Sequence, residues 1–305
     1  MILENTKCIM CKKERTRKLI QVRLPENKSS YIVECKFCKL RYLQPRPKNV
    51  EKLYSNVYWE LSDNKEKEIN NKRFNYIIQQ LEKYHKNLKK VKILEIGIGD
   101  GTLMSMLPNR YEKCGTELTK SQIKDLKKKG IENVYEGEFE NIKFKNKFDI
   151  ILLVHVIEHL KNPREFVKSA KKNLEKKGLL IILTPNDKSL LQKVAKLPII
   201  RKFTIENDPY IRKKIKRNIE VWTQKKKGEF GLRRFLIHTL HHFFFFDPKS
   251  LKKLLQSESY RVRKIHTGTI HPNKFPKKII QNKITNSISK LFGMQEEIFI
   301  VAKKK

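Results

Sequence analysis

The sequence predicts an α/β fold in which a mostly parallel sheet is flanked by helices, and three observations lead to this prediction. The first is an apolar segment, 91–96, that runs directly into a loop with glycine at every second position. The second is the alternation of short apolar segments with helical stretches over 102–190, which is typical of parallel strands joined by crossover helices. The third is a pair of segments near the C-terminus, 260–267 and 297–302, that are expected to form two further strands.

The individual elements follow from local signals. Between the loop and residue 190, the strands are expected at 111–116, 133–136, 148–154 and 178–183. A helix is expected directly after the glycine loop, over 102–107. Asp247 and Pro248 supply an N-cap and a proline at the first helical position, so a further helix is expected to begin at Lys249. With 91–96, 260–267 and 297–302, the predicted sheet has seven strands, and its ligand is expected at their carboxyl ends.

Acidic residues stand at the ends of three predicted strands. Glycines after a strand allow the backbone to approach a ligand closely and to turn sharply into a helix. Glu95 precedes the glycine loop, and Glu117 ends the second strand twenty residues beyond Gly97. A carboxylate at that position can accept hydrogen bonds from both hydroxyls of a ribose. Glu138 follows the third strand, from where it could reach an adenine ring.

Four cysteines form two closely spaced pairs near the N-terminus. Cys8 and Cys11 are followed, after twenty-three residues, by Cys35 and Cys38. Two Cys-x-x-Cys pairs at this separation can place four thiolates tetrahedrally around zinc, and four cysteines leave no open coordination position. Disulfides are the disfavoured alternative because no secretory signal precedes the cysteines. We therefore expect a structural zinc, and a buried thiol at Cys114.

Residues 91–190 resemble class I S-adenosylmethionine-dependent methyltransferases. The resemblance rests on the Glu95–Gly101 loop, the carboxylates Glu117 and Glu138, the His155–Leu160 element and the strand after Gly178. The order of a four-cysteine ribbon, a Pro-x-Pro segment and a cofactor domain is similar to zinc-ribbon methyltransferases, including those that act on sugars. The resemblance implies a Rossmann-like fold, with the glycine loop at the methionine part of the cofactor. It implies these cofactor contacts: Tyr58, Glu95, Gly97, Gly99, Gly101, Glu117, Glu138 and Val154.

Two other interpretations of the glycine loop are weaker. The oxidoreductase fingerprint, Gly-x-Gly-x-x-Gly, requires its third glycine one residue later than Gly101, where this chain has Thr102. An ordinary α/β domain without a cofactor would not need carboxylates at three strand ends.

Histidines after the fourth strand and before Phe243–Phe246 are candidate catalytic groups. A hydroxyl acceptor requires a base near neutral pKa, and His155 lies at the end of the fourth strand. The second candidate is His242, the last histidine of the cluster 238–242. His155–His159 also matches a metalloprotease pattern, which we interpret as a coincidence because His155 ends a strand. In ubiquinone-type O-methyltransferases a similar element binds a divalent metal, which makes Glu158 and His159 candidate ligands for one.

The predicted domain organisation has five parts. They are a zinc ribbon at 1–48, a helical linker and cofactor cap at 49–90, a Rossmann-like domain at 91–189, a basic helical insertion or lid at 190–245, and the end of the methyltransferase domain at 246–305.

The composition is strongly basic, with 69 Lys and Arg against 32 Asp and Glu and a formal net charge of +37. Such a charge favours anionic partners, namely nucleic acid, anionic membrane lipid or a phosphorylated glycan carrier. Most of the lysines are spread along the chain as expected for solvated faces, but 201–227 holds ten Lys or Arg against three Asp or Glu. No segment is apolar for about 18 residues, so none is expected to span a bilayer. We expect a cytoplasmic protein, with membrane-peripheral contact through the basic insertion as the alternative.

Three functions are compatible with the sequence. The first is a methyltransferase acting, by in-line displacement with a histidine base, on a hydroxyl of a small-molecule or glycan acceptor. The second is an RNA methyltransferase that binds phosphates through the ribbon and the basic surface. The third is a zinc-bearing binding protein on a methyltransferase fold, against which the intact glycines and carboxylates argue.

Overall fold

The computed structural model describes residues 2–24, 28–48, 64–188, 242–268 and 296–305. Within these residues a seven-stranded sheet has the order β12-β13-β10-β9-β6-β7-β8. All neighbours from β10 to β8 are parallel, whereas β13 runs antiparallel to both β10 and β12. The expected α/β fold with a seven-stranded, mostly parallel sheet is thus confirmed. The strands are β6 (Val91–Ile96), β7 (Tyr111–Glu117), β8 (Val134–Glu136), β9 (Phe148–Val154), β10 (Leu174–Pro185), β12 (Tyr260–Gly268) and β13 (Glu297–Lys304).

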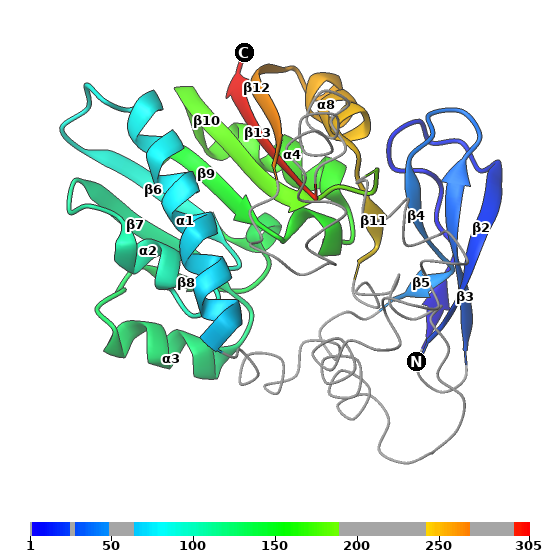
Figure 1. The fold of residues 1–305 in the computed structure, drawn as a ribbon, viewed down its shortest axis with the longest axis horizontal. Coiled ribbons are helices and arrows are strands. Elements are labelled where there is room, and N and C mark those ends of the chain that lie inside the picture. Colours follow the sequence, from blue (N-terminus) through cyan, green and yellow to red (C-terminus); the bar gives the residue numbers. More distant parts are fainter. Residues whose placement is uncertain (1, 25–27, 49–63, 189–241, 269–295) are drawn as a thin grey trace, which may run out of the picture.

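Helices cover both faces of this sheet (Figure 1). They are α1 (Asn64–Tyr84), α2 (Thr102–Met106), α3 (Lys120–Lys128), α4 (Pro163–Asn173) and α8 (Pro248–Ser257). Alternate residues of the strands point to opposite faces, so the core divides in two. Ile77 and Leu81 of α1 pack with Ile93 on one face, and Phe166 of α4 packs with Leu94 on the other. Short 3₁₀ turns, η3 (Phe139–Asn141) and η4 (Ile157–His159), follow β8 and β9.

The strand β10 begins earlier than the sequence predicted. The expected start was Gly178, but Leu174 already pairs with Phe148 of β9, and the register shifts between Leu174 and Leu179. At Gly178 a Cβ atom would lie 3.0 Å from the carbonyl oxygen of Glu175, so the irregular backbone favours glycine here. Glu175, Lys176 and Lys177 are charged, so this part of the strand does not form an apolar run that could be recognised in the sequence.

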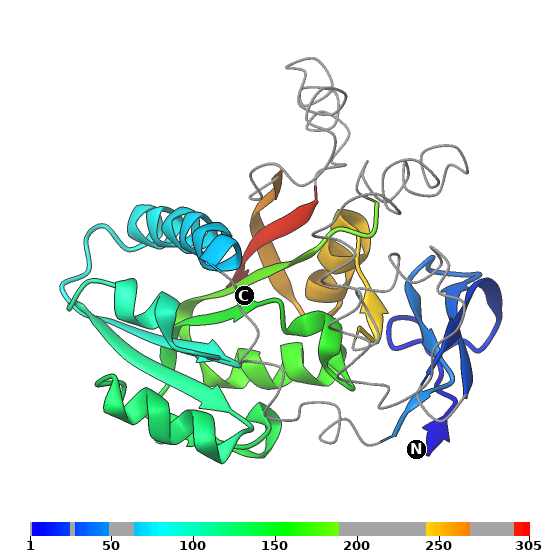
Figure 2. The ribbon, with the colours of Figure 1, turned by 60° about the horizontal axis from the view of Figure 1, so that its bottom comes forward.

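The N-terminal ribbon lies beside the seven-stranded sheet, next to α8 and β11 (Figure 2). Its strands are β1 (Leu3–Glu4), β2 (Thr16–Arg23), β3 (Ser29–Cys35), β4 (Arg41–Gln44) and β5 (Arg46–Pro47). A second sheet has the order β11-β4-β3-β2, in which β11 is Phe244–Phe245. The ribbon therefore shares a sheet with a segment from the far end of the chain.

The expectation of a buried thiol at Cys114 is confirmed, and the four residues Phe243–Phe246 are buried as well. All four phenylalanines are at most 9% exposed, and Cys114 in β7 is buried as a free thiol. The predicted helix after Asp247 is also present, since Pro248 is its first residue and Asp247 accepts a hydrogen bond from the Ser250 amide. The predicted insertion lies almost wholly outside the described residues, and so does Tyr58.

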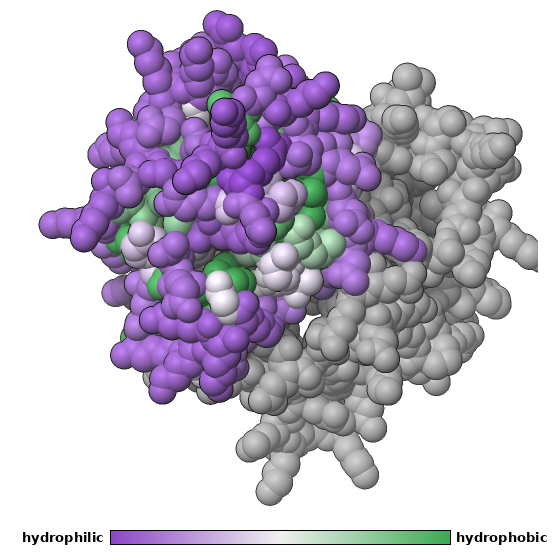
Figure 3. All heavy atoms as spheres, turned by 90° about the vertical axis from the view of Figure 1, so that its left-hand side faces the viewer, coloured by the Kyte–Doolittle hydropathy of each residue, from purple (hydrophilic) through white to green (hydrophobic). Residues whose placement is uncertain are grey.

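The surface on the side of α1, α2 and α3 is mainly hydrophilic, with small apolar areas between charged side chains (Figure 3). Among the described helices, none combines the length and the apolar character needed to cross a bilayer.

Candidate active site and cysteine cluster

The loop between β6 and α2 contains three glycines in the left-handed region, with φ of 65° at Gly97, 58° at Gly99 and 75° at Gly101. The Gly97 amide donates to Thr116 Oγ1 of β7 at 3.3 Å. A Cβ atom at Gly97 would lie 3.1 Å from a methyl group of Val156. The loop is thus packed between the end of β7 and the segment after β9, and its backbone conformation requires glycine.

Glu95 lies behind this loop in β6 and is 4% exposed. Burial raises the pKa of its carboxyl group well above the usual value, with a smaller contribution from Asp100. Its Oε2 atom has no hydrogen-bond partner among the described residues. A buried carboxylate oxygen without a partner fits a site that a polar ligand group completes, such as the amino group of a bound amino-acid moiety.

Glu117 ends β7 and is 6% exposed. Its Oε1 accepts hydrogen bonds from the amides of Leu118 and Thr119, at 2.9 and 3.1 Å. Burial raises the pKa of this carboxyl group, and hydrogen bonds from the backbone, including that of Gly99, oppose the rise. The glycine loop and the Glu117 carboxylate therefore lie next to each other, as a ribose site requires.

Glu138 and Val154 occupy the neighbouring strand ends. Glu138 precedes η3, where its carboxylate accepts from Asn141 Nδ2 at 3.3 Å and lies 3.6 Å from Lys161 Nζ. Val154 is the last residue of β9, half-buried and paired with Leu183 of β10. Both residues lie at the carboxyl edge of the sheet, where ligands bind in open parallel sheets.

His155 lies between two buried carboxylates. Its Nε2 lies 2.9 Å from Glu297 Oε1, and its Nδ1 lies 3.4 Å from Glu158 Oε1. Its backbone is left-handed, with φ of 55°, and its amide donates to the Leu183 carbonyl at 2.8 Å. Burial and the nearby Arg73 cation lower the pKa of His155, but the adjacent carboxylates of Glu158 and Glu297 outweigh them, and the pKa is raised. An imidazole with both nitrogens on carboxylates is stabilised as the cation.

Arg73 of α1 extends this network. Its Nη2 and Nε lie 2.7 and 3.2 Å from Glu297 Oε1. Both side chains are buried, with 9% of the Arg73 side chain and 3% of the Glu297 side chain exposed. Positive and negative groups thus alternate along the series Arg73, Glu297, His155 and Glu158. The series ties α1 and β13 to the end of β9.

Glu158 joins this network to a pair of histidines. Its Oε2 accepts from Thr184 Oγ1 at 2.9 Å. Burial favours a raised pKa for Glu158, but the hydrogen bond from His155 and the charges of His159 and His242 lower it to about 2. The rings of His159 and His242 meet edge to face, with centroids 4.5 Å apart. One ligand atom from each of Glu158, His159 and His242 lies within 4.8 Å of the others, so these three could hold a divalent cation.

Sequence reasoning placed His155, Glu158, His159 and His242 as candidates, and the structure brings all four together. The sequence analysis did not identify Arg73, Glu297 or Thr184 as site residues. Glu297 carries a detectable signal, because an acidic residue that opens an apolar strand needs a buried partner. Arg73 carries none, as one of 69 basic residues. His238 and His241 lie outside the described residues.

The four cysteines form one cluster in which all sulfur atoms lie within 4.8 Å of one another. The Sγ atoms of Cys8 and Cys38 are 3.4 Å apart, and those of Cys11 and Cys35 are 3.5 Å apart. Tetrahedral zinc separates its sulfur ligands by about 3.8 Å, given a Zn–S distance of about 2.3 Å. Without a cation, the hydrogen bond to Cys38 and burial raise the pKa of the Cys8 thiol. The donor set and spacing fit zinc, whose charge would stabilise the thiolates.

The two Cys-x-x-Cys turns have matching backbones. In the first, the Lys12 amide donates to the Cys8 carbonyl at 2.8 Å, and Lys12 has φ of 59°. In the second, the Lys39 amide donates to the Cys35 carbonyl at 3.1 Å, and Lys39 has φ of 66°. Such a repeated turn directs both cysteines of each pair toward one centre.

The strand order, the glycine loop and the buried carboxylates at its edge define a class I S-adenosylmethionine-dependent methyltransferase. The family described as "Methyltransferase domain" matches residues 68–265, more than half of the chain, and the chain belongs to this family.

Individual relatives match only part of the chain. The ubiquinone biosynthesis O-methyltransferase of Rickettsia canadensis is 26% identical over 124 residues, which are 39% of this chain and 52% of that protein. The protein of the same name from Pelagibacter ubique is 33% identical over 107 residues, 33% of this chain and 45% of that protein. The chain spans about half the length of the relatives it matches. A solved S-adenosylmethionine-dependent methyltransferase from Clostridium acetobutylicum is 13% identical, with a TM-score of 0.49, over 84% of this chain and 99% of that one.

Proposed function

We propose that this methyltransferase transfers the methyl group of S-adenosylmethionine to a hydroxyl oxygen of a small-molecule or glycan acceptor. The observation that carries the proposal is the placement of the histidine cluster after β9, next to the glycine loop. Val156 packs so closely on the loop that a Cβ atom at Gly97 would lie 3.1 Å from its methyl group. His155, Glu158 and His159 are within three residues of Val156 in the sequence. The printed name of the relatives, an O-methyltransferase, supports oxygen as the attacking atom.

Each cofactor residue has a proposed role. The backbone of Gly97, Gly99 and Gly101, with Glu95 behind it and Val154 beside it, is proposed to bind the methionine part. Glu117 is proposed to bind the ribose and Glu138 the adenine, in the order in which their strands lie along the sheet edge. Tyr58 is retained as the proposed cap. When bound, S-adenosylmethionine supplies an electrophilic methyl group, so the protein's main task is to align the acceptor with it.

Two histidines are proposed to act on the acceptor side, with different roles. His155 is stabilised as a cation by Glu158 and Glu297, which leaves it no lone pair for a proton. We therefore propose that His155 positions the catalytic end of β9 and orients Glu158. His242, at the edge of the His159 ring, is proposed to accept the proton of the acceptor hydroxyl.

Metal binding has two proposed places in this chain. Zinc on Cys8, Cys11, Cys35 and Cys38 would be structural, because four cysteines leave no open position. A divalent cation on Glu158, His159 and His242 would lower the pKa of a bound hydroxyl and make a protein base unnecessary. Full activity of protein that holds a single zinc per chain, in the absence of added Mg²⁺ or Mn²⁺, supports the His242 base, whereas strict dependence on a further divalent cation supports the metal.

The net charge supports an anionic acceptor or carrier. A charge of +37 favours a phosphorylated glycan carrier or an anionic membrane surface, and nucleic acid is the second choice. A cytoplasmic location with peripheral membrane contact is proposed on the same ground.

The test is methyl transfer from tritiated S-adenosylmethionine to three acceptor panels: hydroxylated aromatics, nucleotide sugars and total RNA. Label in a sugar or aromatic ether that is strongly reduced in His242→Ala supports the proposal. Glu112→Ala, at an exposed position near the start of β7, is the control and should keep the wild-type rate. Label in RNA alone would overturn the proposed acceptor class.

A further inference from the structure

We propose that the cysteine ribbon is a metal-dependent support for the acceptor side of the active site. In this proposal, metal binding by the four cysteines fixes the strand that carries His242 against Glu158 and His159, and leaves the cofactor side unaffected. The segment concerned is residues 242–246, called here the His-Phe segment. The inference rests on the proposed function only in naming this side of the site the acceptor side.

The backbone of the His-Phe segment is paired with the ribbon on one edge. Phe244 pairs with Tyr42 and Phe245 with Arg41, in antiparallel register, so that β11 extends the ribbon sheet. The Leu43 amide also donates to the Phe243 carbonyl at 2.9 Å. A two-residue strand of this kind has no stability of its own, so its position depends on β4 and on its other backbone partners.

The same segment is bonded to the catalytic loops through its other backbone groups. The Phe243 amide donates to the Glu158 carbonyl at 2.8 Å, and the Asp187 amide donates to the Phe246 carbonyl at 2.8 Å. The His-Phe segment is therefore a bridge between the ribbon and the ends of β9 and β10. A displacement of β4 would be transmitted directly to the backbone of Glu158 and to His242.

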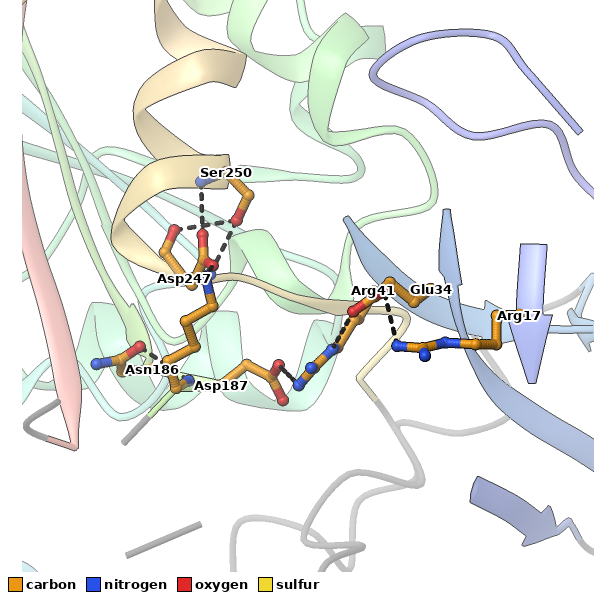
Figure 4. Close-up of polar contacts among 8 residues, drawn as sticks. Arg17, Glu34, Arg41, Asn186, Asp187, Asp247 and Ser250 are labelled. Carbon is orange, nitrogen blue, oxygen red and sulfur yellow. Dashed lines mark hydrogen bonds and ion pairs between the residues drawn. The ribbon is translucent and has the colours of Figure 1, made fainter. Parts of the chain in front are cut away.

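Charged side chains reinforce this junction. Arg41 of β4 lies between Glu34 of the ribbon and Asp187 of the catalytic domain (Figure 4). Its Nε lies 3.2 Å from Glu34 Oε2, and its Nη1 lies 2.6 Å from Asp187 Oδ2. Only 10% of the Asp187 side chain is exposed, so water screens this pair weakly. The Arg46 guanidinium also donates to the Lys161 carbonyl, and its centre lies 5.6 Å from the Phe243 ring.

Apolar packing across the junction is continuous. Tyr42, Phe243, Phe244 and Phe246 are each at most 2% exposed, and they belong to the same core cluster as the ribbon cysteines and the α4 face of the sheet. Burial of these aromatic side chains removes a large apolar area from water, which stabilises the junction. The ribbon is thus packed as part of the catalytic core.

The metal cluster controls the strand that makes these contacts. Cys35 ends β3, and the second cysteine turn leads directly into Arg41, the first residue of β4. A module of this size depends on its metal for folding free energy. Loss of the metal would release the turn that fixes Arg41 and Tyr42. Glu95 and Glu117, by contrast, belong to β6 and β7, and neither strand pairs with the ribbon.

The test compares zinc-loaded wild-type protein with Cys38→Ser by hydrogen–deuterium exchange and mass spectrometry. We expect amides in peptides covering 242–247 to exchange at least about tenfold faster in the variant, equivalent to about 1.4 kcal/mol. Peptides covering 97–105 should be unchanged, and the Kd for S-adenosylhomocysteine should stay within about twofold. Equal exchange of 242–247 in a variant that has lost zinc would overturn the proposal, and so would a wild-type protein that holds no zinc.

A second variant covers the case in which Cys38→Ser fails to fold. Asp187→Asn removes the ion pair with Arg41 and should retain one zinc per chain, yet still accelerate exchange of 242–247. Arg17→Gln is the matched control, because Arg17 pairs with the same Glu34 from the solvent side and 64% of its side chain is exposed. It should change neither exchange nor zinc content, and equal effects of the two variants would count against the proposal. Absence of cofactor binding in the wild-type protein would instead refute the proposed function.

Discussion

Replacement of Glu297 by glutamine tests the buried charge network most sharply. The substitution preserves shape but removes the negative charge that lies 2.7 Å from Arg73 Nη2 and 2.9 Å from His155 Nε2. Glu297 is 3% and Arg73 7% exposed, so water cannot replace the lost charge. Removal of one partner from a buried ion pair costs about 3–5 kcal/mol. We expect a loss of this size in the free energy of unfolding, and a melting temperature lower by roughly 10 °C.

The effect should depend on pH, because His155 is part of the network. Its pKa is raised in the folded protein, so its contribution to stability is fully present below the unfolded value of about 6.5. That contribution is lost as the pH rises through the higher folded value. The difference between wild type and Glu297→Gln should therefore be largest below about pH 6.5 and decrease above it.

The assay is urea denaturation followed by circular dichroism at several pH values. Glu112→Gln, an exposed position on β7, is the control and should change stability by less than about 0.5 kcal/mol. The double variant Arg73→Met, Glu297→Gln should be less destabilised than the sum of its single variants, because it leaves no unpaired guanidinium. A loss below about 1 kcal/mol for Glu297→Gln, independent of pH, would refute the buried network.

Three further predictions follow from individual contacts. Gly101→Ala should cost about 2–5 kcal/mol of stability, because a Cβ atom on this left-handed backbone would lie 2.5 Å from a methyl group of buried Leu126. In the control, Gly130→Ala, the Cβ atom meets nothing within 4 Å, so only about 1–2 kcal/mol of backbone strain is expected. Equal melting temperatures for the two variants would contradict the packing at Gly101. Thr184→Val leaves a buried carboxylate oxygen without its donor, so denaturation should show a loss of about 1–3 kcal/mol, and an unchanged midpoint would exclude that hydrogen bond. Elemental analysis should find one zinc per chain, lost in Cys11→Ser but retained in Cys114→Ser; zinc in both variants would refute the four-cysteine site.

Local signals carried the prediction of the fold. The helix after Asp247 was predicted because capping is encoded within four residues, and the structure confirms it with a capping box that includes Ser250. The strands at 111–116 and 148–154 were predicted within one residue, the second because its apolar run marks a buried strand locally. The class of enzyme was predicted from the glycine loop together with the carboxylates Glu117 and Glu138, the His155–Leu160 element and the strand after Gly178.

What the sequence did not reveal depends on contacts between distant residues. The pairing of Phe244 with Tyr42 joins positions about two hundred residues apart, and no local pattern specifies such a partner. The same holds for Arg73 and Glu297. The proposed base illustrates the consequence, since only the structure shows that His155 lies between the carboxylates of Glu158 and Glu297.

Titration calorimetry with S-adenosylhomocysteine tests the central claim most directly. Zinc-replete wild-type protein should bind with micromolar affinity, and Glu117→Ala should weaken binding at least about tenfold, because it removes the buried carboxylate beside the glycine loop. Glu112→Ala, the exposed position on the same strand, should bind like the wild type. Equal affinity for Glu117→Ala and the wild type, or no binding to the wild type, would contradict the assignment of this edge of the sheet as the cofactor site.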